Sequence, residues 1–538
     1  MRIGIDLDNT LICYEDIFQK IAKTMSLVPK NWYGNKEQVR DIIRKRPNGE
    51  DLWQQTQGHV YSEGIQDAQS FPGALRFIWR AKHKGYQLFI VSHKTEFSVY
   101  DSTLNLRKPA LKWLEEKSLY SETQKSLFEG VYFTSAQNDK VEKINQLDLD
   151  VFIDDLMEIT EHPLIKDNLN MVHFGKDSFP SWIMIENHLL GNIDETDCSH
   201  LIIDAGLGTP LGCMPYNKGG NSSVWKVDLE NNYPLTIKFY HNDLLHNDRR
   251  KVEKFALEAM WQYGIKNIPK MMATDNIIEA SIFKHLEAGV ISDLDIRKLD
   301  EIVAFIEKLK DVKKGVGENF PLASAACLCG EDIVEQIDSR LLNLQQAISI
   351  DQDLNSFINK EFNPFCDLLT EWAKSNWPDN NKFNEPLEFN KQILTPSDLG
   401  VHNMLENDNG DIFFIDFEYF GLDDPAKTVS DFLWQPKNNI NDELGNIWVN
   451  NMINLFSEED PDFTRRLAIS WPLYGLCWCL IMLNEFRDIN WSRRKQSRGY
   501  DNSEFVRVKL QQLKKAKDLL DFIKINYKEF PYSNIRVN

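Results

Sequence analysis

The fold of the first third of the chain is decided by residues 1–10, which read Met-Arg-Ile-Gly-Ile-Asp-Leu-Asp-Asn-Thr. An apolar run leads directly into Asp6 and Asp8, and Thr10 follows two residues later. The apolar run predicts a short buried strand with these polar side chains at its carboxyl end. Because the strand begins at residue 2, without a long apolar segment or a small-residue cleavage site, we expect no targeting signal.

The pattern of this first strand repeats along the next 170 residues. Further strand-like runs occur at 87–91, 130–133, 150–153 and 170–174, with helical stretches such as 74–84 and 109–117 between them. Strand–helix alternation of this kind predicts an α/β fold, a doubly wound parallel sheet covered on both faces. Residues 13–70 interrupt the alternation with helix-like segments, which we interpret as a small helical insertion.

Reactive side chains follow several of these strands. They are Asp6, Ser92, Asp154 and Asp155, with Lys140 at the start of the helix before the fourth strand. The carboxyl ends of parallel strands line one crevice, so Asp6 and Asp154 should face each other there. Close carboxylates repel unless a cation lies between them, and oxygen ligands suit Mg²⁺. An Asp held against Mg²⁺ can attack phosphorus, and a second Asp two residues on can protonate the leaving oxygen.

Each of these residues alone is more often a helix cap, a loop residue or a solvated lysine, but the ordered set is specific. Asp-x-Asp-x-Thr, a strand ending in Ser, a Lys and an apolar-Asp-Asp motif resemble the haloacid dehalogenase (HAD)-like phosphatase superfamily over roughly residues 1–185. The resemblance implies that residues 13–70 form a cap that selects the substrate. It also implies these roles: Asp6 as nucleophile, Asp8 as general acid/base, Thr10, Ser92 and Lys140 as phosphate ligands, and Asp6, Asp8, Asp154 and Asp155 around Mg²⁺.

A different pattern begins after a polar, aperiodic stretch at 191–200, which we interpret as a linker. The glycine-rich segment Gly219, Gly220, Asn221 and Ser222 precedes two strand-like runs, and Lys238 lies in the middle of the second run. Backbone N–H groups of such a loop can approach phosphates closely, although Gly-Gly alone is more often a simple turn. In the helix that follows, Glu253 lies at the edge of the apolar stripe and Glu258 on the opposite face. Glu253 is therefore the expected partner of Lys238.

The strongest signal in the second half is the segment 395–416. Asp398 and Asn403 precede an apolar run, the turn Asn407-Asp408-Asn409-Gly410 follows, and a second apolar run ends at Asp416. Asn-Gly between apolar runs predicts a hairpin, which would bring Asn403 nearly opposite Asp416. Asp, Asn and Asp together supply oxygen ligands for Mg²⁺ and a base for a hydroxyl nucleophile. The alternative is that these acidic residues lie at the end of a hairpin and have no catalytic role.

These motifs, in this order, resemble the aminoglycoside phosphotransferase and choline kinase-like superfamily over roughly residues 201–538. The resemblance implies a two-lobed, α+β kinase-like fold, with an N-lobe at about 201–290 and a C-lobe at about 291–538. It implies ATP or GTP as donor, bound by the 219–222 loop, Lys238 and Glu253. It also implies Asp398 as the catalytic residue and Asn403 and Asp416 as Mg²⁺ ligands.

The chain departs from the family pattern around the catalytic residue. The usual His-Gly-Asp is Pro396-Ser397-Asp398, and Gly400 replaces a histidine. Those histidines mainly support the loop, so we expect activity to survive, but the substrate class stays open. His402 has no counterpart in the motif; packing within the loop is the expected role and a substrate contact is the alternative.

Composition limits the partners. The 538 residues include 61 Lys+Arg and 81 Asp+Glu, a net charge of −20, with 42% hydrophobic residues. So acidic a chain is a poor candidate for binding nucleic acid or an anionic membrane. The apolar run at 471–483 is shorter than the roughly 20 residues that a membrane helix needs. The eight cysteines form no Cys-x-x-Cys pair, so we expect a cytoplasmic protein without disulfides or zinc; its oligomeric state is left open.

The sequence therefore favours a bifunctional enzyme, a Mg²⁺-dependent phosphatase fused to a small-molecule hydroxyl kinase. Two opposing activities make sense when they act on different positions, as in sugar-phosphate routes to surface-polysaccharide precursors. The alternatives are a nucleotide-binding pseudokinase that regulates or scaffolds the phosphatase, and an antibiotic kinase of the aminoglycoside type. The substrates of either half are not identified by the sequence.

Overall fold

The N-terminal part of the chain is built on a five-stranded parallel sheet. A computed structural model describes residues 1–30, 32–121, 126–176, 179–218, 222–230, 233–240, 248–487 and 502–533. The sheet has the order β5-β4-β1-β6-β7, and every neighbouring pair is parallel. Its strands are β1 (Arg2–Ile5), β4 (Gln87–His93), β5 (Phe128–Thr134), β6 (Val151–Asp154) and β7 (Asn170–His173). The predicted parallel α/β sheet is confirmed.

Helices cover both faces of this sheet because its strands are apolar on both sides. Leu88 and Ile90 of β4 pack with one cluster of buried side chains, and Phe89 and Val91 pack with another. The first cluster includes side chains of α4 (Ala74–His83), α5 (Arg107–Glu116) and α8 (Trp182–Leu190). The second includes side chains of α6 (Gln137–Gln146) and α7 (Met157–Thr160). This is the double covering expected of a buried parallel sheet.

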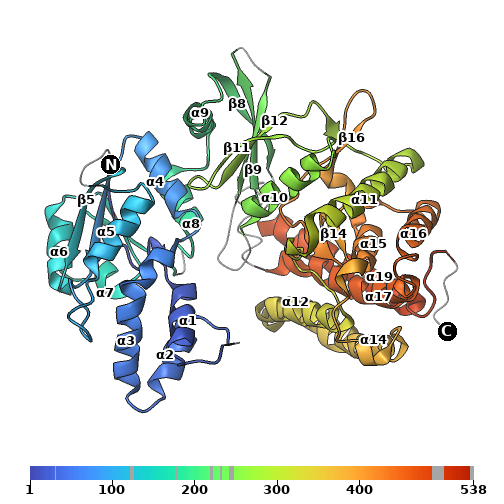
Figure 1. Cartoon of the computed structure of the whole chain (residues 1–538), viewed down its shortest axis with the longest axis horizontal. Helices are drawn as coiled ribbons and strands as arrows, with labels where there is room; N and C mark the ends of the chain where they lie inside the picture. The colour runs from blue at the N-terminus through green and yellow to red at the C-terminus, as the bar shows by residue number, and fades with distance from the viewer. Residues whose placement is uncertain are drawn as a thin grey trace.

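A helical insertion leaves the sheet between β1 and α4. It consists of α1 (Glu15–Thr24), α2 (Lys36–Arg44), α3 (Gly49–Tyr61) and the short helix η1 (Gly64–Asp67). Two short antiparallel strands, β2 (Ile12–Cys13) and β3 (Gln69–Ser70), carry the chain into and out of the insertion. Its helices project beyond the carboxyl edge of the sheet (Figure 1), so they are placed to wall a site there.

The C-terminal part begins with a five-stranded antiparallel sheet in the order β11-β12-β10-β9-β8. Its elements are β8 (Pro210–Lys218), β9 (Ser222–Leu229), β10 (Leu235–Tyr240), α10 (Arg249–Gln262), β11 (Met271–Asp275) and β12 (Ala280–Lys284). The predicted loop residues Gly219, Gly220 and Asn221 lie outside the described residues. The two strands that follow the loop, β9 and β10, pair antiparallel as predicted, with Ser222 opposite Tyr240.

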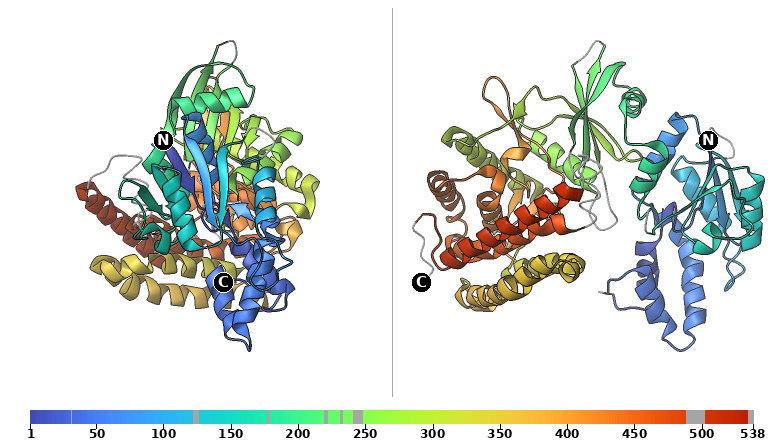
Figure 2. Two further views of the ribbon diagram at one scale, coloured as in Figure 1. Left: turned by 90° about the vertical axis from the view of Figure 1, so that its left-hand side faces the viewer. Right: turned by 180° about the vertical axis from the view of Figure 1, so that it is seen from behind.

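The remaining residues form a mostly helical body. Its longer helices are α11 (Ile296–Val316), α12 (Gly330–Ile350), α14 (Asn363–Asn376), α15 (Pro425–Trp434), α16 (Asp442–Phe456), α17 (Phe463–Met482) and α19 (Asn502–Asn526). Two small sheets lie among them: β13 (Gly289–Val290) with β15 (Met404–Glu406) and β16 (Ile412–Phe414), and β14 (Ile393–Thr395) with β17 (Gly421–Asp423). Helix α19 packs along α17 (Figure 2). The segment 463–486, which includes α17, is long and apolar enough to cross a membrane, but 78% of its most apolar window is buried inside the protein.

The second half of the predicted linker at 191–200 is helical. Helix α9 (Glu195–Asp204) begins there, with Asp194 as its N-cap. The Asp194 side chain accepts hydrogen bonds from the N–H groups of Thr196 and Asp197, and the Asp197 side chain accepts one from the Asp194 N–H. The polar residues that suggested a linker are therefore the capping residues of a helix.

Two buried arginines of α4 join the N-terminal and C-terminal parts. Arg80 donates to Asp197 of α9 and to Glu186 of α8, and its remaining N–H groups reach the carbonyls of Gly191 and Asn192. Arg76 pairs with Glu186 at 2.7 Å and donates to the carbonyl of Tyr240 at the end of β10. Both arginines are 1% exposed. The two parts therefore share a buried ionic interface.

Replacing Arg80 by alanine should destabilise the protein strongly. The change removes the buried cation that pairs with Asp197 and Glu186, and breaking a buried ion pair on one side costs about 3–5 kcal/mol. A thermal scan of the full chain should show a fall of several degrees in the unfolding midpoint. Lys82→Ala is the control, because Lys82 lies on the same helix in a more exposed pair with Glu129, where the loss is about 1 kcal/mol or less. Equal midpoints for the two variants would contradict this account.

Candidate active sites

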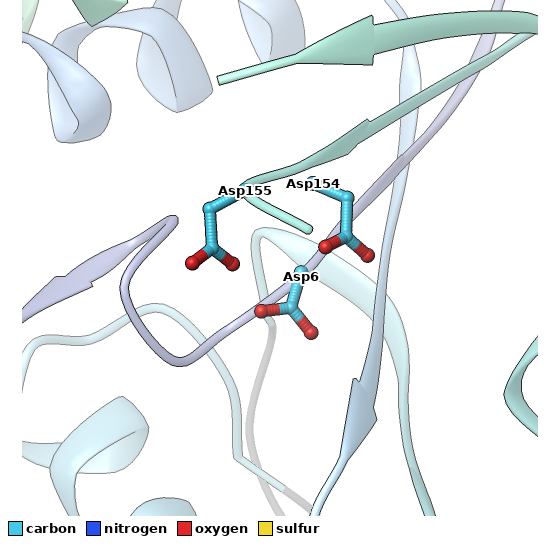
Figure 3. Close-up of side chains that lie close together, drawn as sticks. All are labelled: Asp6, Asp154 and Asp155. Atoms are coloured by element: carbon cyan, nitrogen blue, oxygen red, sulfur yellow. The ribbon is translucent and has the colours of Figure 1, made fainter. Parts of the chain in front are cut away.

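Three carboxylates meet at the carboxyl edge of the parallel sheet. Strands β1 and β6 are neighbours with Ile5 opposite Ile153, so Asp6 and Asp154 follow at the same level. One oxygen from each of Asp6, Asp154 and Asp155 lies within 4.8 Å of the others (Figure 3). The strand register thus produces the convergence that the sequence predicts.

Lys140 is the cation that faces this cluster. From α6, its Nζ lies 2.6 Å from Asp6 Oδ1 and 2.7 Å from Asp154 Oδ2. Burial, followed by the charges of neighbouring carboxylates, raises the pKa of Asp6 and raises the pKa of Asp155 to about 6. Burial alone would lower the pKa of Lys140, but Asp6 and Asp154 raise it above its ordinary value. Lys140 is shared by the two buried carboxylates of Asp6 and Asp154, the partly buried Asp155 lies beside them, and this donor set fits a further divalent cation such as Mg²⁺.

Asp8 has partners that the sequence analysis missed. The Tyr14 hydroxyl donates to Asp8 Oδ1 at 2.6 Å, and Lys94 Nζ lies 2.7 Å from Asp8 Oδ2. Lys94 is buried and also lies 5.0 Å from the centre of the Tyr61 ring. The position of Lys94, two residues after Ser92, was the feature of the sequence that could have indicated a role at this site. Asp8 is therefore held in one orientation by two donors.

Ser92 is free to bind an anion, whereas Thr10 is not. Ser92 Oγ is buried and has no hydrogen-bond partner among the described residues. The Thr10 hydroxyl instead accepts from the Asp155 N–H at 3.1 Å and donates to Asp155 Oδ1 at 3.2 Å. Thr10 thus ties the loop after β1 to the loop after β6. The phosphate-binding role predicted for Thr10 has no support in this geometry.

A cavity of about 510 Å³ opens above these residues. Its floor includes Asp6, Asp8, Ser92 and Lys140. Its walls include Gln54, Gln57 and Tyr61 of α3 and Lys94 and Tyr100 of the segment after β4. The helical insertion therefore contributes directly to the walls of the space in which a substrate would lie.

The second cluster surrounds Lys238 of β10. Its Nζ lies 2.8 Å from Glu253 Oε2, the partner expected from the sequence, and 2.5 Å from Asp416 Oδ1. Glu418, which the sequence analysis did not select, lies 3.3 Å away. Burial would lower the pKa of Lys238, but these carboxylates raise it well above its ordinary value. Lys238 is therefore a permanently charged group among acidic side chains.

The predicted hairpin holds the remaining site residues. Met404 pairs with Phe414, and the Ile415 N–H donates to the Asn403 carbonyl, so Asn403 and Asp416 lie at the same end. Asn403 Nδ2 donates to the backbone carbonyl of Asp398 at 3.0 Å. Burial would raise the pKa of Asp398, but a hydrogen bond from His402 and the charges of His402 and Lys437 hold it below its ordinary value. Asp398 is thus kept as a carboxylate.

Backbone strain occurs on both sides of this site. Ser397 and Asp416 have φ values of 68° and 67°, in the left-handed region. Such conformations cost on the order of 1–3 kcal/mol in non-glycine residues and cluster at functional sites. At Ser397 the hydroxyl donates to the Ser324 carbonyl at 3.2 Å, and at Asp416 the carboxylate meets Lys238. These contacts offset the strain and fix the two loops.

No family model matches the chain. A curated protein of Oceanobacillus iheyensis that bears a provisional nucleotidase name is 20% identical over 177 residues, 32% of this chain and 85% of that protein.

Solved structures of kinases are similar to more than half of the chain. The choline kinase LicA of Streptococcus pneumoniae is 16% identical over 60% of this chain and 98% of its own, with a TM-score of 0.39. An ethanolamine kinase of Plasmodium vivax is 16% identical over 64% of this chain and 95% of its own, with a TM-score of 0.42. A spectinomycin phosphotransferase is 13% identical over 62% of this chain and 98% of its own, also with a TM-score of 0.42. At these values the similarity assigns neither activity nor substrate, which must come from the geometry of the sites.

Proposed function

We propose that this chain is a bifunctional phosphoryl-transfer enzyme. Residues 1–190 form a HAD-like phosphatase with a cap at about 13–70, and residues 201–538 form a kinase-like phosphotransferase. The observation that carries the proposal is the pair of separate acidic sites, each with a buried lysine, Lys140 in the first and Lys238 in the second. We further propose a cytoplasmic location, in keeping with the acidic chain and its free cysteines.

In the phosphatase site, Asp6 attacks the phosphorus of a phosphate monoester. The bond from phosphorus to the leaving oxygen breaks as an aspartyl-phosphate forms, and Asp8 gives a proton to that oxygen. Asp8 then takes a proton from water, whose oxygen attacks the same phosphorus and releases Asp6. Ser92 Oγ and Lys140 Nζ bind the phosphoryl oxygens throughout. Mg²⁺ held by Asp6, Asp154 and Asp155 would neutralise the charge of the phosphoryl group.

In the kinase site, Asp398 accepts the proton of an acceptor hydroxyl. The hydroxyl oxygen attacks the γ-phosphorus, and the bond to the β–γ bridging oxygen of the donor breaks. Lys238, held by Glu253, binds donor phosphates. Mg²⁺ held by Asn403 and Asp416 would neutralise the phosphate charges.

For the kinase acceptor and the phosphatase substrate we propose a chemical class. The cavity above Asp6 has amide and phenol side chains in its walls, which suits a polar organic phosphate such as a sugar phosphate. The similarity to the provisionally named nucleotidase adds nucleoside monophosphates to the substrates worth testing. Two assays test the two halves. The first measures the release of phosphate from a panel of sugar phosphates and nucleotides. The second measures phosphoryl transfer from ATP or GTP to sugar phosphates, amino alcohols and aminoglycosides. Turnover by one half alone would contradict the paired activity.

Two other functions remain as alternatives for the C-terminal part. Pro396 and Gly400, where the kinase pattern has other residues, favour a nucleotide-binding pseudokinase. ATP binding without transfer to any acceptor would select it. Turnover of aminoglycosides alone would select an antibiotic kinase.

Mg²⁺ should bind the N-terminal site more tightly as the pH rises. Burial raises the pKa of Asp6 and Asp155, so protons compete with the metal in the neutral range. Without metal, Asp6 and Asp155 lose their protons at a lower pH in the unfolded chain than in the folded one. Their contribution to the stability of the folded protein therefore falls as the pH rises through their raised folded-state pKa values. The rise in thermal midpoint on adding Mg²⁺ should therefore be larger at about pH 8 than at about pH 5.5.

Asp154→Asn should abolish that difference in the Mg²⁺ effect, because it removes one of the three carboxylates. Asp139→Asn, an exposed change on α6, should preserve it. A Mg²⁺ effect of the same size at both pH values would argue against a metal at this cluster.

A further inference from the structure

His402 lies directly against the proposed catalytic carboxylate. Its Nε2 is 3.1 Å from Asp398 Oδ2, four residues earlier in the chain. Because an ionised carboxylate only accepts hydrogen bonds, Nε2 must carry the hydrogen, which assigns the tautomer of the ring. The other nitrogen, Nδ1, is buried and has no partner among the described residues. Nε2 is therefore engaged by Asp398 and is not available to a substrate.

Gly400 provides the space that the imidazole occupies. A Cβ atom at position 400 would lie 2.6 Å from His402 Cε1 and 2.7 Å from His402 Nδ1, closer than real Cβ contacts come. The backbone itself does not require glycine, since φ at Gly400 is −145°. The absence of a side chain at 400 is thus explained by the ring of His402.

The backbone of this loop is held without His402. Asn403 Nδ2 donates to the Asp398 carbonyl, and the Val401 N–H donates to Asn438 Oδ1 at 2.9 Å. Asn438 is itself fixed by a bond to the Phe432 carbonyl. Besides His402, Gln435 Nε2 donates to Asp398 Oδ1 over a long 3.4 Å, and the Asn403 side chain and the charge of Lys437 also act on this carboxylate. His402 therefore acts on the rotation of the carboxylate rather than on the position of the loop.

We propose that His402 is a positioning residue for Asp398 and that Gly400 exists to admit its ring. This inference rests on the proposed kinase function. The hydrogen bond to Oδ2 fixes the plane of the carboxylate and leaves Oδ1 to take the proton of the acceptor hydroxyl. That hydroxyl oxygen then bonds to the γ-phosphorus as the β–γ bridging bond breaks. An unfixed carboxylate would spend most of its time in other rotations, which lowers the rate of the transfer step and not the binding of the donor.

Four variants of the full chain test the proposal against an acceptor turned over by the wild type. His402→Ala and Gly400→Ala should each lower kcat by about 10–100-fold with the KM for ATP unchanged. His402→Gln, whose Nε2 can donate to the same oxygen, should recover most of the loss. In the double variant Gly400→Ala/His402→Ala, kcat should equal that of His402→Ala, because the added methyl group then has no ring to displace.

Several controls and outcomes separate the explanations. Release of phosphate from an aryl phosphate by the N-terminal site should stay at the wild-type level in all four variants, which shows that the N-terminal part is intact, and the unchanged KM for ATP shows the same for the C-terminal part. His188→Ala, an exposed change on α8, should leave kcat for transfer unchanged. Additive losses in the double variant, or full kcat in His402→Ala, would overturn the inference alone. A wild type that binds ATP and phosphorylates no acceptor would overturn the kinase function, and the inference with it.

Discussion

Asp398→Asn should lower phosphoryl transfer to the acceptor hydroxyl by about 10²–10⁴-fold, the usual contribution of a general base. Asparagine keeps the size of the side chain, and its amide oxygen can still accept the hydrogen bond from His402, but it cannot take the proton. The donor is bound elsewhere, by Lys238 with Glu253, so the affinity for ATP should remain within a factor of a few. Single-turnover transfer and calorimetric binding of ATP measure the two quantities separately.

Asp408→Asn is the matched control for this prediction. Asp408 is an exposed carboxylate in the turn of the same hairpin, so its removal should change neither transfer nor ATP binding. Parallel loss of ATP binding and transfer in Asp398→Asn would show that Asp398 supports the structure of the site rather than its chemistry.

Asp6→Asn should reduce the release of phosphate from an aryl phosphate by at least about 10⁴-fold, as expected when a covalent nucleophile is removed. The variant should still fold, since it removes a charge from a crowded, buried cluster in which Lys140 keeps Asp154 as its partner. The thermal midpoint without metal should therefore be equal to or above that of the wild type. A stopped phosphate-release assay together with a thermal scan distinguishes lost chemistry from lost structure.

The exposed carboxylate of Asp16 in the first turn of α1 offers the control. Asp16→Asn should retain the wild-type rate. Unchanged phosphate release by Asp6→Asn would remove Asp6 as the nucleophile.

The parts of the fold that follow from local patterns were predictable. The five parallel strands were marked by apolar runs bounded by polar residues, and the 404–414 hairpin by its Asn-Gly turn. Asp6 and Asp154 could be paired because adjacent parallel strands end at the same edge of a sheet. Glu253 could be preferred to Glu258 because helical periodicity separates their faces.

Contacts that depend on tertiary packing were not predictable. Tyr14 reaches Asp8 from a loop and Lys94 reaches it from the segment after β4. The position of Lys94 after Ser92 marks it as a candidate, but nothing in the sequence pairs either residue with Asp8. Thr10 was assigned to phosphate because of its position in the motif, whereas its hydroxyl is taken by Asp155. Its partner comes from a loop 145 residues away, which no local pattern reveals.

The interface between the two parts was also beyond local patterns. Arg76 and Arg80 lie in a helix whose sequence suggests only an amphipathic segment, yet both are buried by elements more than 100 residues away. Helix α9 was interpreted as a linker because capping residues and linker residues are the same polar types. The role inferred for His402 depends on a contact between side chains and on the empty space at Gly400, which sequence spacing does not reveal.

The central claim is that one chain holds two independent phosphoryl-transfer sites, and a crossed assay of the two active-site variants tests it most directly. Wild type, Asp6→Asn and Asp398→Asn should each be assayed for phosphate release from an aryl phosphate and for transfer from ATP to an acceptor. The account predicts that Asp6→Asn loses release and keeps transfer, and that Asp398→Asn keeps release and loses transfer. Loss of both activities in either variant, or of neither, would contradict it.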